Sequence, residues 1–159
     1  MASKEKSHIG YIAYIDILGF SQESTLRRFQ NHFDEYYKCV QESIEPPLEF
    51  ILSSDNIIIY SDSVNAKCFK NIIRSCAYLF SNLLNIQIAP RGCISQGQYS
   101  ILETEKNNVV IVGPSLVDAV HYEQEQNWIG IMISPLVWKK QMEKRQRTLN
   151  CSKPKLAIY

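Results

Sequence analysis

The chain has 159 residues, of which 45% are hydrophobic and 21% are charged, and its formal net charge is +1. This length and composition are typical of one soluble globular domain, which we expect to span residues 1–159. The near-neutral charge argues against nucleic acid or an anionic membrane as a partner. No apolar run approaches the roughly eighteen residues of a membrane helix, and the polar N-terminus lacks the apolar stretch of a signal peptide.

The cysteines favour a cytoplasmic location. Their number is odd, they are widely spaced and no CxxC pair occurs, so we expect reduced thiols rather than disulfides or a zinc site. They are Cys39, Cys68, Cys76, Cys93 and Cys151.

The first predicted element is a strand over residues 8–18, which are almost continuously apolar, as in a central strand covered on both faces. A helix follows over residues 26–44, where apolar side chains recur at helical spacing until a Pro-Pro pair ends the pattern. Two short strands at residues 49–52 and 56–60 then flank a polar turn, which is a hairpin signal.

The second half continues with alternating helices and strands. In order, these are a helix at 65–84 capped by Asn65, strands at 86–100 and 109–112, a helix at 113–126, a strand at 129–133, a basic helix from 135 and the start of a strand at 155–159. The order β-α-β-β-α-β-β-α-β-α-β contains the split βαβ arrangement of ferredoxin-like folds. We therefore predict an α+β sandwich whose mostly antiparallel sheet carries helices on one face.

Two aspartates stand out against this pattern. Asp16 lies near the end of the most apolar strand, where an unpaired buried carboxylate costs several kcal/mol, unless it turns to solvent or caps the next turn. Asp55 lies in the hairpin turn, where aspartate is also a common turn residue. In a split βαβ sheet the first strand lies beside the hairpin, so both carboxylates become neighbours and can hold two divalent cations.

Asp62 is the other aspartate near the hairpin. It lies seven residues beyond Asp55, about 23 Å along an extended strand, so the two cannot serve one metal pair. We expect Asp62 to help Asn65 cap the following helix. The basic stretch at 139–147 is interpreted as a solvated helix face.

Four segments, taken in order, resemble the class III nucleotidyl cyclases. They are AYIDILGF (13–20), SSDNIIIYS (53–61), RGCISQG (91–97) and VGPSLVDAVHYE (112–123). The pattern is most similar to the small bacterial cyclases of the Pycsar antiphage system, which make cyclic UMP or cyclic CMP. The resemblance implies their palm domain, a homodimer with active sites between the subunits, and two Mg²⁺ or Mn²⁺ ions per site.

The resemblance also assigns residues to the site. Asp16, Asp55 and the carbonyl of Ile17 would bind the metal ions. The backbone N–H groups of Leu18, Gly19 and Phe20, at a helix start, suit the triphosphate, although a plain strand-to-helix turn needs no ligand.

The sequence departs from the family at the positions that recognise the base and stabilise the transition state. Ile51 and Val110 stand where purine cyclases carry polar base readers, and Val117 and His121 stand where they carry an asparagine and an arginine. Arg91 could supply the missing positive charge from a neighbouring strand, or it could be a surface arginine on an edge of the sheet.

The substrate follows from these departures. We expect Phe50 and Ile51 to narrow the base pocket, with Val110, until only a single-ring base fits, and the resemblance favours UTP over CTP. The alternatives are a catalytically silent cyclase-like module that dimerises and binds nucleotide, and a purine cyclase with a rebuilt base pocket.

Overall fold

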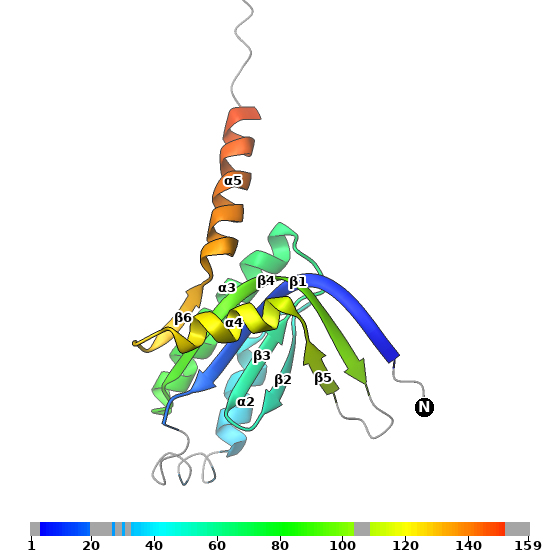
Figure 1. Ribbon diagram of the computed structural model, residues 1–159. Helices are drawn as coiled ribbons and strands as arrows, with labels where there is room; N and C mark the ends of the chain where they lie inside the picture. The colour runs from blue at the N-terminus through cyan, green and yellow to red at the C-terminus, as the bar shows by residue number, and fades with distance from the viewer. Residues whose placement is uncertain (1–3, 20–26, 28–29, 31–32, 104–108, 152–159) are drawn as a thin grey trace, which may run out of the picture.

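The computed structural model of the chain describes residues 4–19, 27, 30, 33–103 and 109–151 (Figure 1). The elements are β1 (Lys4–Ile17), α2 (Phe33–Ser43), β2 (Glu49–Ser53), β3 (Asn56–Tyr60), α3 (Ala66–Asn85), β4 (Pro90–Glu103), β5 (Val109–Val112), α4 (Pro114–Gln124), β6 (Gly130–Ile133) and α5 (Pro135–Cys151). Their order is the one predicted from the sequence. The strand expected at 155–159 and part of the first predicted helix lie outside the described residues.

A single sheet holds the domain together. Its strand order is β2-β3-β1-β4-β5, and β6 pairs with β4. All pairings are antiparallel except that of β6 with β4. β1 therefore lies inside the sheet between β3 and β4, as its apolar sequence predicts. The predicted α+β class with a mostly antiparallel sheet is confirmed.

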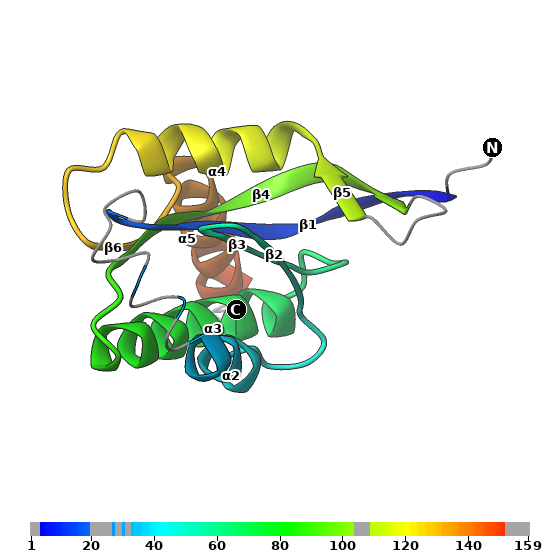
Figure 2. The same cartoon turned by 90° about the horizontal axis from the view of Figure 1, so that it is seen from below.

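The helices do not all cover one face of the sheet, which corrects the prediction. Figure 2 shows α2 and α3 on one side of the sheet and α4 on the other. Small residues allow α4 to lie close to β4: the Ser95 hydroxyl donates to the Ser115 carbonyl, and the Ser115 hydroxyl donates to the Gln98 carbonyl at 3.0 Å. A Cβ on Gly97 would lie only 3.3 Å from the Ser115 Cβ. The α4 contact thus depends on small polar residues rather than on an apolar stripe.

Side chains on β1 alternate between the two faces. Tyr11, Ala13 and Ile15 are buried in the core that faces α2 and α3. Ile12 belongs to a second buried cluster on the α4 side, and Tyr14 packs against that cluster. By the same alternation, Asp16 shares the α4 face with Ile12 and Tyr14.

Two boundaries differ from the sequence prediction. α3 runs to Asn85 and the chain then turns through Gln87, whose φ is 61°, so β4 begins at Pro90 instead of residue 86. α5 is longer than the short helix expected, and it projects away from the sheet (Figure 1). Its base is anchored by buried Val137 and by a 2.7 Å hydrogen bond from the Gln141 amide to the Tyr11 hydroxyl.

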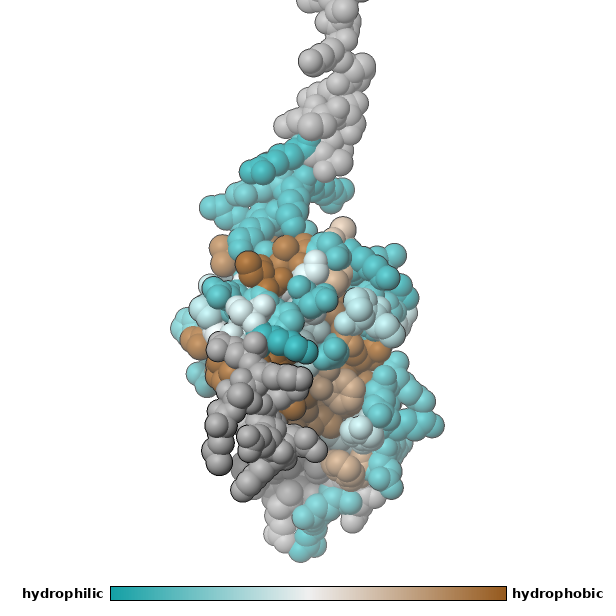
Figure 3. Space-filling model, turned by 90° about the vertical axis from the view of Figure 1, so that its right-hand side faces the viewer, coloured by the Kyte–Doolittle hydropathy of each residue, from teal (hydrophilic) through white to brown (hydrophobic). Residues whose placement is uncertain are grey.

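The surface of α5 and the state of the cysteines agree with what the sequence predicts. Figure 3 shows a largely hydrophilic surface on projecting α5, as expected for a solvated basic helix. Within the described ranges, no helix has the length and apolar character needed to cross a membrane. Four cysteines are free thiols, of which the last three are buried: Cys39, Cys68, Cys76 and Cys93.

Candidate active site

The β1–β3 pairing brings Asp16 and Asp55 together. Asp16 lies opposite Asn56 in the register, and the Ile17 N–H donates to the Asp55 carbonyl at 3.0 Å. The β2–β3 turn is tight because Ser54 adopts a left-handed φ of 58°. The hairpin thus ends beside the last residues of β1, as the split βαβ topology requires.

Asp16 lies in an environment that disfavours its negative charge. Its side chain is only 24% exposed, so it is not a strand-end aspartate turned to solvent. Burial raises the pKa of Asp16 to about 6, and the carboxylates of Glu123 and Asp55 add to the effect. The Arg91 guanidinium opposes this rise without cancelling it.

A chain of hydrogen bonds orients Asp55. The Tyr14 hydroxyl donates to the Asn56 side-chain oxygen at 2.5 Å, and the Asn56 amide donates to the Asp55 carboxylate at 3.1 Å. Burial, followed by the nearby Asp16 carboxylate, raises the pKa of Tyr14 to about 12, which keeps this hydroxyl a donor at neutral pH. Sequence reasoning missed both Tyr14 and Asn56, although their positions beside the two aspartates could have signalled them.

Arg91 lies opposite Asp16 on β4 and is held by the α4 segment. Its Nε donates to Glu123 Oε1 at 2.5 Å, and its Nη1 donates to the Gln126 carbonyl at 3.1 Å. The alternative of a surface arginine on a sheet edge is wrong, because β4 lies inside the sheet and this side chain is 23% exposed. Sequence reasoning also missed Glu123, which is 4% exposed.

The contact between Arg91 and Asp16 is longer. Arg91 Nη2 lies 4.0 Å from Asp16 Oδ2, beyond the 2.7–2.9 Å or so of a charge-assisted hydrogen bond. Arg91 therefore stays close to Asp16 without occupying its oxygens. Asp16 retains lone pairs for another ligand.

The charges and oxygen atoms of the acidic side chains beside Arg91 suit a divalent cation. Asp16, Asp55 and Glu123 bring more negative charge than Arg91 neutralises. Burial raises the pKa of Asp16 most, and this charge excess adds to the rise. Across the described residues, no group of three or more His, Cys, Asp or Glu side chains is arranged to hold a metal ion. Mg²⁺ sites commonly use one or two carboxylates plus substrate phosphates and water, and Asp16 with Asp55 matches that donor set.

The predicted phosphate cradle is wrong at Leu18. Its N–H donates to the Ala89 carbonyl at 2.9 Å and is not available to an anion. Gly19 adopts a left-handed φ of 72°, which glycine tolerates, and its role toward phosphate stays a prediction. Phe20 lies outside the described residues.

The predicted base pocket is also wrong in part. Phe50 packs against the core on the α2 side, with its ring 6.5 Å from that of Tyr37, whereas Ile51 packs on the α4 side. Adjacent strand residues point to opposite faces, so the two cannot narrow one pocket together. Val110 pairs with Leu102 next to buried Ile111, so alternation turns Val110 away from the face that carries Ile51.

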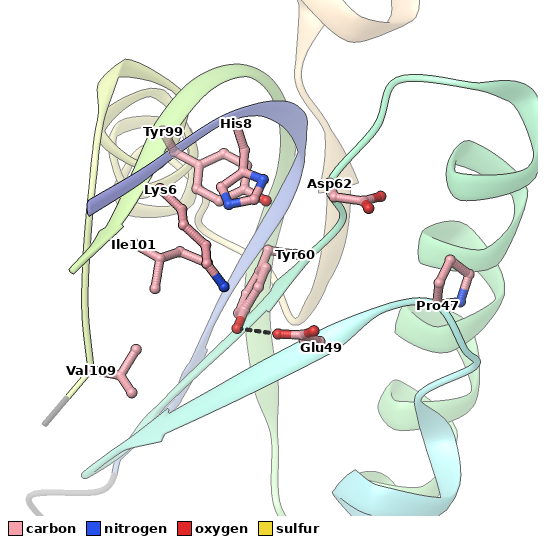
Figure 4. A pocket seen from close by; sticks show the side chains of 9 residues that line it. All are labelled: Lys6, His8, Pro47, Glu49, Tyr60, Asp62, Tyr99, Ile101 and Val109. Carbon is pink, nitrogen blue, oxygen red and sulfur yellow. Dashed lines mark hydrogen bonds between the residues drawn. The ribbon is translucent and has the colours of Figure 1, made fainter. Parts of the chain in front are cut away.

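Asp62 does not belong to the acidic pair formed by Asp16 and Asp55, as predicted. It also does not cap α3, which the sequence analysis had expected. The Asn65 side chain alone accepts the capping hydrogen bond from the Cys68 N–H, at 2.8 Å. Asp62 instead lines a cavity beyond the far end of β3 (Figure 4).

No protein-family model and no curated protein matches this chain in sequence. Among solved structures, it is similar to two monomeric crystal structures of the guanylyl cyclase domain of the RhoGC fusion protein from the aquatic fungus Blastocladiella emersonii. A double mutant of that domain gives a TM-score of 0.56 at 17% identity and covers 84% of this chain and 82% of that one. The other structure gives 0.54 at 16% identity and covers 84% of each chain.

The chain has the class III nucleotidyl cyclase fold. On this fold, Asp16 at the end of β1 lies beside Asp55 in the β2–β3 turn, and the outer surface of α4 carries the two positions where the resemblance expects an asparagine and an arginine. Val117 is 66% exposed and the His121 side chain is 64% exposed. Valine has no polar group in place of the amide, and histidine has no permanent charge in place of the guanidinium.

Proposed function

We propose that this chain is a metal-dependent nucleotidyl cyclase that converts a pyrimidine nucleoside triphosphate, UTP before CTP, into the 3′,5′-cyclic nucleotide and diphosphate. The observation that carries the proposal is the proximity of Asp16 to Asp55 in a nucleotidyl cyclase fold, where Asp16 is half-buried amid excess negative charge. A purely structural site would have little reason to keep two carboxylates there, since burial disfavours their charge.

The proposed reaction is an intramolecular phosphoryl transfer. The ribose 3′ hydroxyl gives its proton to water as its oxygen forms a bond to the α-phosphorus. The bond from that phosphorus to the bridging oxygen breaks, and diphosphate leaves with the electron pair. Bound Mg²⁺ or Mn²⁺ would lower the pKa of the attacking hydroxyl and neutralise the triphosphate. Asp16 and Asp55, with the Ile17 carbonyl, would hold these ions, and Tyr14 and Asn56 would fix the orientation of Asp55.

Arg91 is the proposed source of positive charge for the transition state. It stands in the same chain as the acidic pair, with Glu123 and Gln126 holding its guanidinium in place. A preorganised guanidinium stabilises charge that develops on the transferred phosphoryl group. This role would compensate for the missing arginine at position 121, where this chain has a histidine.

We further propose a homodimer with active sites between the subunits. The exposed outer face of α4, with Val117 and His121, would lie against the acidic pair of a second copy. Mixing an Asp16→Ala chain with a chain disrupted in the 113–123 segment should then restore activity that neither chain has alone. A monomer that is fully active at micromolar concentration would contradict this arrangement.

The pyrimidine substrate and a role in antiphage defence in the cytoplasm rest on the Pycsar resemblance and on apolar Ile51 at a position where purine cyclases read the base. The test is incubation of the purified chain with each of the four nucleoside triphosphates and Mn²⁺, with product identification by mass spectrometry. Cyclic UMP as the main product would support the proposal. Dominant cyclic AMP or cyclic GMP would overturn the pyrimidine assignment.

A catalytically silent nucleotide-binding module is the second candidate. The observation in its favour is the loss of the asparagine and arginine at Val117 and His121. Absence of any cyclic nucleotide from all four triphosphates, with a folded protein that still binds nucleotide, would favour this function over the enzyme.

A further inference from the structure

An open apolar groove lies between α3 and β6, on the face of the sheet opposite the one that carries Asp16. It has a volume of about 450 Å³, and of the described residues that line it, none is charged. Its walls include Ile73, Ala77 and Phe80 on α3, Ile131 and Ile133 on β6, and Trp128 before β6. Trp128 is 53% exposed, so solvent reaches this apolar surface. An apolar groove of this size is typical of an interaction site.

The edge of β6 offers backbone groups beside the groove. β6 pairs with β4 over Gly130–Ile133, and no other strand of the described residues pairs with it. Its sequence has neither a charged residue nor a proline, which are common means of protecting a sheet edge. Ile131 and Ile133 pack against the core on the α3 side, so the open edge adjoins the groove. A short apolar strand laid beside β6 would therefore pair with its edge and cover the groove.

A segment with the required pattern follows α5. The sequence predicts the start of a strand at residues 155–159, which read Lys-Leu-Ala-Ile-Tyr. In a strand, Leu156 and Ile158 point to the same face and have the same two-residue spacing as Ile131 and Ile133. The five residues of this segment are close in length to the four of β6.

The direction of α5 keeps this segment away from the groove of its own chain. α5 follows β6 closely, has 17 residues and points away from the sheet (Figure 1). A helix of this length extends about 25 Å. Residues 152–154 can bring the chain back by only about 10 Å, even when they are fully extended. Residues 155–159 therefore cannot lie along β6 of the same chain.

We infer that residues 155–159 of a second copy of this chain fill the groove, as a strand added to the open edge of β6. The exchange is reciprocal, since in a two-fold dimer each groove receives the segment of the other chain. Leu156 and Ile158 of the second copy enter the groove beside Ala77 and Ile131. The inference does not rest on the proposed function, because the groove and the outer face of α4 are different surfaces and neither metal nor nucleotide is involved.

Two antiparallel α5 helices would deliver the segments. This arrangement places the C-terminal end of each α5 beside β6 of the other chain, within the reach of residues 152–154. Trp138 and Met142 are 56% and 40% exposed and lie one turn apart on α5, so they offer an apolar stripe to the second helix. α5 also carries five basic residues and one acidic residue. Because these like charges repel, association should become tighter as the salt concentration rises.

The test mixes two variants of the full chain. Ala77→Lys places an ammonium group at an exposed position of the groove and leaves the segment intact. The double change Leu156→Lys with Ile158→Lys alters the segment and leaves the groove intact. The second chain is isotope-labelled, and the amide resonances of Ala77, Phe80 and Ile131 are followed as the unlabelled Ala77→Lys chain is added. We expect these resonances to shift on mixing, whereas neither variant alone should show a docked groove.

The wild-type chain provides the affinity. Its groove resonances should shift as its concentration rises, and Ala77→Lys should raise the midpoint of that change at least about tenfold, because docking would bury an unpaired ammonium group. Tyr78→Lys is the matched control. Tyr78 is the next residue on α3, is 49% exposed and lies outside the groove lining, so this variant should behave like the wild type.

Two results would overturn the inference. One is the absence of groove shifts on mixing, with both variants shown to be folded by circular dichroism. The other is a set of groove shifts in the dilute wild-type chain that does not depend on concentration, because the segment would then occupy the groove of its own chain. Cyclase turnover enters neither measurement, so failure of the proposed enzyme and failure of the strand exchange are separate outcomes.

Discussion

The two ends of β1 present the same face of the same sheet, yet they differ in chemistry. At one end, Asp16 and Asp55 lie beside Glu123 and Arg91, with an excess of negative charge. At the other end, His8 stacks on Tyr99 in a cavity with an aromatic wall and a charged rim. Both ends contain two carboxylates outside α4, which are Asp16 and Asp55 at the first end and Glu49 and Asp62 at the second.

On the proposed function, the acidic end holds the metal ions, because carboxylates converge there and burial makes their unneutralised charge costly, as at Asp16. At the other end, Tyr60 and Tyr99 pack against each other edge to face instead. The following changes test whether the two ends act separately.

Removing either aspartate should have the largest effect. Asp16→Ala and Asp55→Ala should each lower cyclase turnover by at least about a hundredfold, because the metal supplies several kcal/mol of charge stabilisation. Circular dichroism should show an intact fold. Glu42→Ala, which removes an exposed carboxylate on α2, is the control and should retain full activity. Near wild-type turnover in Asp55→Ala would refute the assignment of that residue.

Gly10→Ala should damage both ends together. Gly10 lies between them on β1, and a Cβ there would lie 1.7 Å from the Ser61 carbonyl oxygen, so the backbone of the sheet must move. We expect a loss of about 3 kcal/mol in the free energy of unfolding, at the upper end for overpacking. Urea denaturation measures it, with Gly97→Ala as a milder comparison because its nearest neighbour is a side chain at 3.3 Å. Equal stability of the two variants would contradict this packing.

Glu123→Ala should affect the acidic end alone. It would leave the partly buried Arg91 guanidinium without its closest partner, and we expect a loss of about 2 kcal/mol in unfolding free energy, reduced from the fully buried case because Arg91 is partly exposed. Glu123→Gln, which retains a hydrogen-bond acceptor, should lose less. The stacking of His8 on Tyr99 at the other end should not change in either variant, and altered amide chemical shifts of these two residues would show that the two ends are coupled.

Asp16→Asn should stabilise the metal-free protein, and this gain in stability should be smaller than the loss expected for Glu123→Ala. The folded pKa of Asp16 is raised to about 6 from 3.8, so its ionisation lowers stability as pH rises from about 4 to about 6. At pH 7 the variant should gain about 1–2 kcal/mol in unfolding free energy, with solvent screening taken into account. Denaturation in the presence of a chelator should show this gain shrinking as the pH falls toward 4 and vanishing below the unfolded pKa of 3.8. A gain that is equal at pH 4 and pH 7 would show that charge is not its cause.

The sequence was informative where local pattern and topology agree. The neighbouring positions of Asp16 and Asp55 followed from a central strand beside a hairpin, and both elements had clear apolar patterns. The side of the sheet that α4 covers could not be predicted, because α4 packs through Ser115 on Ser95 rather than through an apolar stripe. Without that placement, Glu123 could not be recognised as the partner of Arg91.

The prediction of the base pocket failed for a different reason. Phe50 and Ile51 are adjacent in a strand, and adjacent side chains point to opposite faces, so the sequence already contained the evidence against a shared pocket. The cavity at His8 could not be predicted because its residues come from strands distant in sequence. Only the register of β1 with β4 places His8 opposite Tyr99.

The most direct test of the metal site is Mn²⁺ binding followed by paramagnetic broadening of amide resonances. If Asp16 and Asp55 hold the ion, substoichiometric Mn²⁺ broadens the signals of Asp16, Ile17 and Asp55 and leaves those of His8 and Tyr99 sharp. The double change Asp16→Asn with Asp55→Asn then removes the broadening, and lowering the pH below about 6 weakens it, because Asp16 then holds a proton. Broadening centred elsewhere, or unchanged in the double variant, would contradict the metal site at Asp16 and Asp55.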